Sequence, residues 1–369
     1  MRALNPMVVV VVWILLSLTA APSVRSQAAW GDAKYPPTTE GDFVVHNFKF
    51  KSGQSMPEVR LHYTTLGKPE RDAQGRTTNA VLILHGTGGS GYQFLAPYFA
   101  NELFNPGQIL DASRYYSILV DGVGHGKSSK PSDGMHAHFP EYDYDDMVAL
   151  HHVLLTEGLK VNHLRLIFGT SMGCMHSFVW GETYPDFMDA LMPMACLPVQ
   201  LAGRNRIWRK MVLDGIRTDP EWKNGDYTTE PPQGIRIALD FLLIAGSAPI
   251  PMQKALPTRD DADKYLDEYF HDRMAGLDAN DLWYQVNASR NYDPSPNLEK
   301  ITVPVMWMNS GDDFINPPDL GIAELEVKRL KKGKFILIPA SEQTPGHGTH
   351  TFAAVWKDHL AELLQQSAH

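Results

Sequence analysis

The stretch from Leu164 to Thr183 reads LRLIFGTSMGCMHSFVWGET and contains the pattern G-x-S-x-G at residues 169–173. An apolar run typical of a buried strand precedes this pattern, and a helical pattern follows it. A chain that turns sharply from a strand into a helix needs glycines beside the turn, because larger side chains would collide there. The stretch therefore predicts a strand, a tight turn and a helix, with the hydroxyl group of Ser171 held out of the sheet.

Short continuous apolar runs recur on both sides of this stretch, and such runs suit strands that are buried on both faces. They are Ala80 to Leu84, Tyr116 to Val120, Leu164 to Phe168, Ala190 to Cys196, Val303 to Asn309 and Phe335 to Ile338. Helical patterns lie between them, and this alternation predicts an α/β fold with a mostly parallel sheet and helices on both faces. Two earlier β-rich stretches, Phe43 to Phe50 and Glu58 to Leu66, are expected to form an antiparallel pair.

Residues 201–300 break the alternation of strand and helix. Their Pro and Gly interruptions and partly helical patterns favour an insertion, although residues 204–230 are too irregular for an assignment. Ligands of parallel sheets bind beyond the carboxyl ends of the strands, so we expect the insertion to form a helical lid there. The predicted division is a core of residues 27–200 and 301–369 and a lid of residues 201–300.

A serine hydroxyl is a weak nucleophile at neutral pH, so it needs a base, which in turn needs an acid to orient it. After a turn of the kind seen at Ser171, the acid and then a histidine follow along the chain, each after a later strand. Asp312 and Asp313 stand in the first such loop. We favour Asp313, four residues before Pro317, because Asp312 can hydrogen-bond within its own turn.

Two histidines follow the last predicted strand. His347 is flanked by glycines, which allow a close approach to Ser171, whereas His350 is nearer to the next helix and is expected to cap it. We therefore favour His347 as the base. Ser171, Asp313 and His347 predict acyl transfer through a covalent serine intermediate.

The glycine-rich segment LHGTGGSG, residues 84–91, follows the third predicted strand. Its glycines let the backbone approach a reacting carbonyl group, and we expect the N–H groups of Thr87 and Met172 to form the oxyanion hole. A phosphate-binding loop is disfavoured, because it needs Gly-Lys-Ser or Gly-Lys-Thr at fixed spacing.

No metal site and no cofactor are predicted from the sequence. His136, His138, His151, His152 and His176 have no carboxylate or cysteine at a recognised ligand spacing beside them.

The composition limits the classes of partner. The chain has 369 residues, of which 43% are hydrophobic, and a formal net charge of −9, which disfavours binding to nucleic acid. The expected partner is a small-molecule acyl substrate. The two cysteines, Cys174 and Cys196, each lie in an apolar stretch and are expected to be buried thiols, although an oxidising compartment would permit a bridge.

The first 26 residues are typical of a signal peptide. Arg2 supplies a positive start, residues 8–18 form an apolar run, and residues 24–26 offer a cleavage site with small residues. The apolar run is short for a membrane span, which needs roughly 20 residues, so we expect no stable span. The sequence thus predicts export to the periplasm or secretion, with a mature chain that begins near Gln27.

From about Phe43 onward the chain resembles the homoserine O-acetyltransferase branch of the α/β-hydrolase superfamily. The resemblance rests on Asp146-Met147-Val148, Gly169 to His176, Tyr184-Pro185-Asp186, Asp219 to Trp222, Gly225-Asp226-Tyr227 and Gly346-His347. It implies a triad of Ser171, Asp313 and His347 under a helical lid, in a homodimer. It also implies an arginine that holds a substrate carboxylate, for which Arg209 is the candidate and Arg206 the neighbouring alternative.

Three functions follow from these residues. Export favours water as the acyl acceptor, so the first is a serine-dependent hydrolase of an ester or a related acyl substrate. The second is a related O-acyltransferase, in which the lid excludes water and binds an alcohol or a thiol. The third is a non-catalytic binding protein with the same fold, because a fold alone does not imply an activity.

Overall fold

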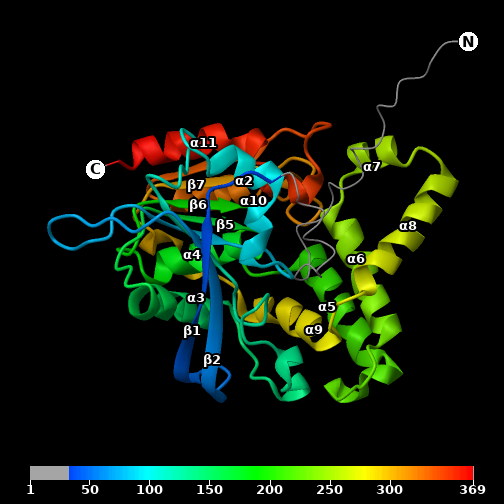
Figure 1. The fold of residues 1–369 in the computed structure, drawn as a ribbon. Coiled ribbons are helices and arrows are strands. Elements are labelled where there is room, and N and C mark those ends of the chain that lie inside the picture. The colour runs from blue at the N-terminus through cyan, green and yellow to red at the C-terminus, as the bar shows by residue number, and fades with distance from the viewer. Residues whose placement is uncertain (1–32, 369) are drawn as a thin grey trace, which may run out of the picture.

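The computed structural model describes residues 33–368, which form one eight-stranded sheet in the order β1-β2-β4-β3-β5-β6-β7-β8 (Figure 1). β1 (Thr38–Lys49) and β2 (Ser55–Leu66) pair antiparallel, as predicted, and β2 also runs antiparallel to β4. The other neighbouring strands pair parallel. They are β3 (Ala80–Leu84), β4 (Tyr116–Val120), β5 (Leu166–Thr170), β6 (Leu191–Met194), β7 (Val305–Ser310) and β8 (Gly333–Ile338).

Helices cover both faces of the sheet, as predicted (Figure 1). On one face α2 (Pro97–Leu103) and α11 (Ala353–Gln366) pack over an apolar core around Phe99, Phe168 and Trp356. On the other face α3 (Tyr144–Val153) and α4 (Met172–Thr183) bury a second core. The remaining short helix of the core is α10 (Ile322–Glu326).

Short 3-10 helices and one π-helical turn fill the connections. They are η2 (Gly91–Leu95), η3 (Pro131–Asp133), η4 (His136–His138), the π-helical η5 (Leu154–Gly158), η6 (Pro220–Gly225), η7 (Ala288–Asn291), η8 (Ser295–Lys300), η9 (Pro318–Leu320), η10 (Val327–Arg329) and η11 (Gly346–Thr351).

Five helices lie between β6 and β7, to one side of the sheet (Figure 1). They are α5 (Gly203–Thr218), α6 (Pro232–Gly246), α7 (Pro249–Ala255), α8 (Arg259–Met274) and α9 (Ala279–Asn287). The sequence left residues 204–230 unassigned, but α5 occupies much of this segment. Its apolar side chains Trp208, Val212 and Ile216 recur every four residues and are buried in the insertion's own core, which stabilises the helix despite many charged neighbours.

The expectation of two buried thiols is wrong, because Cys174 and Cys196 form a disulfide. Cys174 lies in the first turn of α4 and Cys196 lies just after β6, and their Cα atoms are 5.8 Å apart. This separation is within the range that a disulfide spans. Apolar surroundings, which suggested free thiols, are equally compatible with a buried bridge.

The predicted signal peptide, residues 1–26, lies outside the described residues. Within residues 33–368, the helices are individually too short or too polar to cross a bilayer, and only the bent pair α6 and α7 passes a test of length and composition.

Candidate active site

Ser171 lies at the corner between β5 and α4, in a backbone conformation with φ of 55°. This is the left-handed region, which a non-glycine residue rarely adopts. A Cβ atom on Gly169 would lie 2.0 Å from the carbonyl oxygen of Gly173, and one on Gly173 would lie 2.1 Å from that of Leu84. The two glycines are therefore required by close backbone contacts, and they allow the turn that the sequence pattern predicts.

The structure brings the three predicted triad side chains together. The hydroxyl of Ser171 donates to Nε2 of His347 over 2.8 Å, and Nδ1 of His347 donates to Oδ2 of Asp313 over 2.9 Å. All three side chains are buried, with Ser171 at 7% exposure. In this arrangement the imidazole can accept the serine proton, while the carboxylate fixes its tautomer and stabilises the imidazolium that forms.

Asp313 is held as a carboxylate inside the protein. Its burial alone would raise the pKa, but the charge of His347 and hydrogen bonds from His347 and Asn316 lower the pKa below its usual value. The N–H groups of Ile315 and Asn316 also donate to Oδ1, over 2.7 and 3.2 Å. The sequence did not reveal the role of Asn316, although this residue stands directly before Pro317 in the same loop as Asp313.

Asp312 and His350, the alternatives to Asp313 and His347, do not form part of the hydrogen-bond chain to Ser171. Asp312 accepts hydrogen bonds from Ser310 in its own turn, and from the Thr344 hydroxyl and the Gly346 N–H over 3.0 and 3.2 Å. It therefore ties the acid loop to the histidine loop. His350 does not cap α11 as expected, because α11 begins two residues after η11 ends; its ring packs 5.4 Å from that of His347 instead.

The predicted oxyanion donors come from two elements that meet beside Ser171. Met172 is the first residue of α4, so its N–H has no acceptor within the helix and lies at the positive end of the helix dipole. Thr87 follows β3 and is buried. This arrangement is suited to a negatively charged oxygen bound to the carbon that Ser171 attacks.

The side chain of His85 holds the loop that carries Thr87. Its Nε2 accepts from the Gly122 N–H over 3.0 Å, so Nδ1 carries the ring proton and donates to the Gly86 carbonyl over 2.8 Å. The carbonyl of Gly86 and the N–H of Thr87 belong to one trans peptide plane and point in opposite directions. His85 and the Gly89 N–H, which also donates to the Gly86 carbonyl over 3.0 Å, thus together fix the direction of the Thr87 N–H.

His85 belongs to a buried group of histidines behind the site. His125, His151 and His176 are its other members, and burial lowers the pKa of each ring. The ring centroids of His85 and His125 are 4.9 Å apart, and those of His151 and His176 are 5.9 Å apart. Among the described residues, no group of three or more His, Cys, Asp or Glu side chains is arranged to hold a metal ion.

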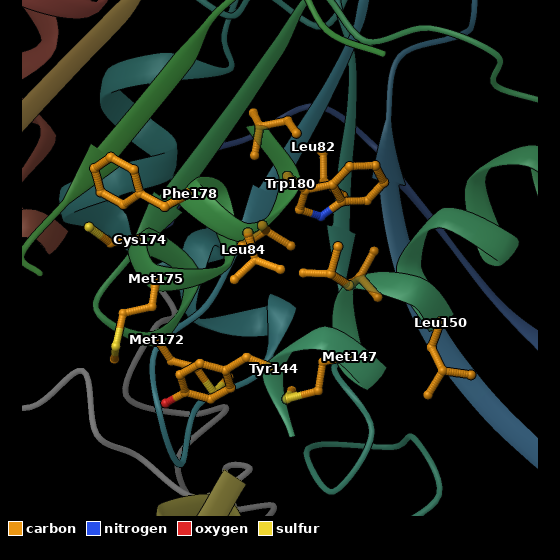
Figure 2. Packing of buried hydrophobic residues seen from close by; sticks show 14 of the residues in the cluster. Leu82, Leu84, Tyr144, Met147, Leu150, Met172, Cys174, Met175, Phe178 and Trp180 are labelled. Carbon is orange, nitrogen blue, oxygen red and sulfur yellow. The ribbon is translucent and has the colours of Figure 1, made fainter. Parts of the chain in front are cut away.

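A polar cluster extends from the oxyanion loop toward the inserted helices. The hydroxyl of Tyr144 lies near the side chains of Thr87, Ser289 and Arg209, while Tyr144 also packs in the apolar cluster with Met172 (Figure 2). Neither the Tyr144 hydroxyl nor the Thr87 hydroxyl has a hydrogen-bond partner in the part of the chain that is described. Both groups can therefore accept a polar ligand.

Arg209 is a buried cation in this cluster, at 2% exposure. Its Nε donates to Asn205 over 2.9 Å and its Nη1 donates to Ser289 over 3.1 Å, and burial lowers the pKa of the guanidinium. Within residues 33–368, no carboxylate lies within ion-pair distance of it. A buried arginine without an acidic partner is well suited to an anionic group from outside the chain.

Comparison with known proteins supports this view of the fold. Residues 79–345 match the family model described as "alpha/beta hydrolase fold". A probable acyltransferase of Methanothermobacter thermautotrophicus is 29% identical over 281 residues, covering 75% of this chain and 84% of that protein. A homoserine O-acetyltransferase of Pelobacter propionicus is 26% identical over 343 residues, covering 82% and 90%.

Solved structures give the same fold. An acetylester hydrolase from Corynebacterium glutamicum matches with a TM-score of 0.76 and 18% identity, over 89% of this chain and 96% of that one. A homoserine O-acetyltransferase from Bacillus anthracis matches with a TM-score of 0.78 and 18% identity, over 89% and 97%.

The chain therefore belongs to the alpha/beta hydrolase fold family, whose model covers most of its length. Its relatives include homoserine O-acetyltransferases, so the resemblance noted in the sequence is confirmed, and so is the predicted fold class. Enzymes of this class, both esterases and O-acetyltransferases, act on small molecules.

Proposed function

We propose that this protein is a serine-dependent hydrolase of small acyl esters that works through an acyl-Ser171 intermediate. The observation that carries the proposal is the continuous hydrogen-bond chain from Ser171 through His347 to Asp313, with distances of 2.8 and 2.9 Å. Nucleophile, base and orienting acid at such distances are the requirements for covalent acyl transfer.

The first half of the proposed reaction forms the acyl-enzyme. Nε2 of His347 takes the Ser171 proton as Oγ attacks the ester carbonyl, and the oxygen that becomes negative faces the N–H groups of Thr87 and Met172. Asp313, held as a carboxylate, stabilises the imidazolium. His347 then gives its proton to the departing alcohol, and the acyl group stays on Ser171.

The second half releases the acyl group. A water molecule loses a proton to Nε2 of His347 and attacks the acyl-Ser171 carbonyl. The proton then returns to the serine oxygen as the carboxylic acid leaves. The same oxyanion donors serve both halves, so their loss slows both steps.

A second candidate function is acyl transfer to an alcohol that carries a carboxylate. The buried, acid-free guanidinium of Arg209 beside the Tyr144 hydroxyl favours it, because such a site can hold the carboxylate of an amino-acid acceptor. Homoserine is the natural acceptor to test first, since several relatives are homoserine O-acetyltransferases.

A fluorophosphonate probe and a chromogenic ester test the main proposal. Labelling is expected at Ser171, as mapped by peptide mass spectrometry, and absent in Ser171→Ala, which should also lose the hydrolysis of p-nitrophenyl acetate. Folded wild-type protein that neither labels nor hydrolyses activated esters would favour a binding protein of the same fold. Addition of homoserine distinguishes the acceptors: O-acetylhomoserine as the main product would favour the transferase.

We also propose that the chain is exported, to the periplasm or the medium. The apolar run at residues 8–18 supports this, as does the bridge between Cys174 and Cys196, since disulfides persist in oxidising compartments. Cell fractionation with N-terminal sequencing tests it. A mature chain that begins near Gln27 in an extracytoplasmic fraction is expected, and an unprocessed cytosolic chain would contradict it.

A further inference from the structure

The segment Met194 to Cys196, at the carboxyl end of β6, contacts both Ser171 and Asn316, the residue that holds the triad acid. The Met194 carbonyl accepts from the Ser171 N–H over 2.8 Å. The Ala195 carbonyl accepts from the side-chain amide of Asn316 over 3.0 Å. Cys196 is bonded to Cys174, in the first turn of the helix that begins beside Ser171. This segment thus connects parts of the site that lie far apart in the sequence.

Asn316 joins this segment to the triad acid. Its Nδ2 donates to both the Ala195 carbonyl and Oδ2 of Asp313, each over 3.0 Å, and its N–H donates to Oδ1 of Asp313 over 3.2 Å. The side chain is buried, at 3% exposure, so water does not readily replace these bonds. Oδ2 is also the atom that accepts from His347. Movement of the Ala195 carbonyl would therefore change the position of Asp313 and the hydrogen bond between Asp313 and His347.

The segment needs its neighbours to hold its conformation. Ala195 has a φ of 67°, in the left-handed region, which is strained for an alanine. Its N–H donates to the Met308 carbonyl over 2.9 Å. The Asn309 side chain accepts from the Cys196 N–H and donates to the Cys196 carbonyl, each over 3.2 Å. The disulfide adds the covalent restraint, and it ties the segment to α4.

We infer that the Cys174–Cys196 bridge and Asn316 act together as a positioning device for Asp313, so that full turnover requires the oxidised bridge. This inference rests on the proposed function. A dithiol that reduces the bridge supplies two electrons and two protons: the S–S bond breaks, two thiols form, and the dithiol closes into its own disulfide. The Ala195 backbone can then relax, and Asn316 loses a fixed acceptor.

A double-mutant cycle tests the inference. It compares Asn316→Ala, the pair Cys174→Ser with Cys196→Ser, and all three changes together, with p-nitrophenyl acetate well below the unfolding temperature. Made in the wild type, Asn316→Ala and the cysteine pair are each expected to lower kcat about tenfold with little change in KM, because misplacing a catalytic group affects the transition state more than substrate binding. The kcat of the combined variant should be only slightly lower than that of the more impaired partial variant, because both changes disable the same support.

The pH dependence of kcat/KM separates a positioning role from a purely structural one, because a loss of folding stability would not shift it. With Asp313 displaced, the imidazolium of His347 is less stabilised, so the acidic limb of kcat/KM should shift to lower pH in both variants. Val45→Ala, in β1 and far from the triad, is the control for stability. It should lower the unfolding temperature and leave kcat and the acidic limb unchanged.

Two outcomes would overturn the inference. Full kcat with a wild-type acidic limb in the cysteine variant would show that the bridge only stabilises the fold, and fully additive losses of kcat would show two independent effects. Should the cysteine variant not fold, wild-type protein whose bridge has been reduced by a dithiol takes its place, and an unchanged kcat in the reduced protein would overturn the inference. Ser171→Ala is the reference for the proposed function: if it abolishes turnover while the other variants are normal, only the inference of this subsection fails.

Discussion

The backbone N–H of Gly173 donates a 2.9 Å hydrogen bond to the carbonyl oxygen of His85. This bond connects the first turn of α4 to the loop after β3. The two predicted oxyanion donors, Met172 and Thr87, lie on either side of it. The bond therefore holds together the two segments that carry those donors, and Gly173 allows the approach because it has no side chain.

Gly173→Ala is expected to impair both stability and activity. The added Cβ would lie 2.1 Å from the Leu84 carbonyl oxygen, a backbone atom that cannot move easily. We expect a loss of about 3 kcal/mol in the free energy of unfolding, measured by urea denaturation, and little remaining esterase activity. Gly53→Ala is the control. Its site has open space but a φ of 88°, so we expect a loss of about 1 kcal/mol in the free energy of unfolding and full activity.

His85→Ala is expected to lower kcat by about tenfold to a hundredfold, with a smaller effect on KM, because the Gly86 carbonyl loses one of the two hydrogen bonds that fix the direction of the Thr87 N–H. Steady-state kinetics on p-nitrophenyl acetate measure this. The exposed His46→Ala should behave as the wild type. A normal kcat in His85→Ala would mean that the loop keeps its conformation without the imidazole.

Neutralising each aspartate of the acid loop distinguishes their roles. Asp313→Asn should reduce kcat by about 10,000-fold, because His347 is then held in the wrong tautomer. Asp312→Asn should reduce stability by about 1–2 kcal/mol and kcat much less, since Asp312 serves the Thr344 and Gly346 contacts. The reverse order of kcat values would assign the triad acid to Asp312.

Acid should destabilise the fold through the buried histidines. Burial lowers the pKa of His151 to about 3, whereas an unfolded histidine titrates near 6.5. Between these values the unfolded chain binds more protons than the folded chain. The contribution of uncharged His151 to stability is therefore complete above about pH 6.5 and is lost as the pH falls toward 3. Burial raises the pKa of Asp281 to about 6, so the folded chain binds more protons at this residue between about pH 4 and 6. Asp281 therefore adds stability as the pH falls through this range, which partly offsets the loss from His151.

His151→Phe isolates that contribution, because both ring nitrogens of His151 lack hydrogen-bond partners among the described residues. The variant should be as stable as the wild type or more stable at pH 7, and its free energy of unfolding should fall less steeply with acid, by up to about 1.4 kcal/mol per pH unit. Urea denaturation from pH 4.5 to 7.5 measures both. Parallel curves for the two proteins would contradict the prediction.

Arg209→Gln is expected to affect charged substrates selectively. Hydrolysis of neutral p-nitrophenyl acetate should change little, whereas esters or acceptors that carry a carboxylate should lose about tenfold to a hundredfold in kcat/KM. Lys210→Gln on the same helix, exposed and paired with Asp214, is the control. Equal losses for neutral and charged esters would mean that Arg209 supports the fold and does not select substrates.

Much of the geometry of the candidate site could be predicted because its signals are local. Gly169 is required by a backbone contact within the turn, with the Gly173 carbonyl, and Gly173 by a contact with Leu84 on the neighbouring strand β3. The choice of Asp313 rests on its distance from Pro317 along a short loop. The strands were predicted within a few residues, because buried parallel strands are continuous apolar runs.

The remaining features depend on contacts between distant elements. The pairing of Cys174 with Cys196 depends on how the loop after β6 packs on α4, and two apolar neighbourhoods cannot reveal it. The role of Asn316 depends on the left-handed backbone of Ala195, which no residue type signals. α5 was missed because charged side chains outnumber the apolar ones of its buried stripe, which also contains the buried Arg209.

The five helices between β6 and β7 contain none of Ser171, Asp313 and His347, yet they contain Arg209. In the proposed function, bond cleavage and the choice of reaction partner would thus be encoded in separate stretches of the gene. Grafting this insertion from a relative could redirect the enzyme to a new acceptor while its reactive centre stays intact. Such a chimaera would have to keep Cys196, which lies just before the first exchanged helix and forms the bridge to Cys174.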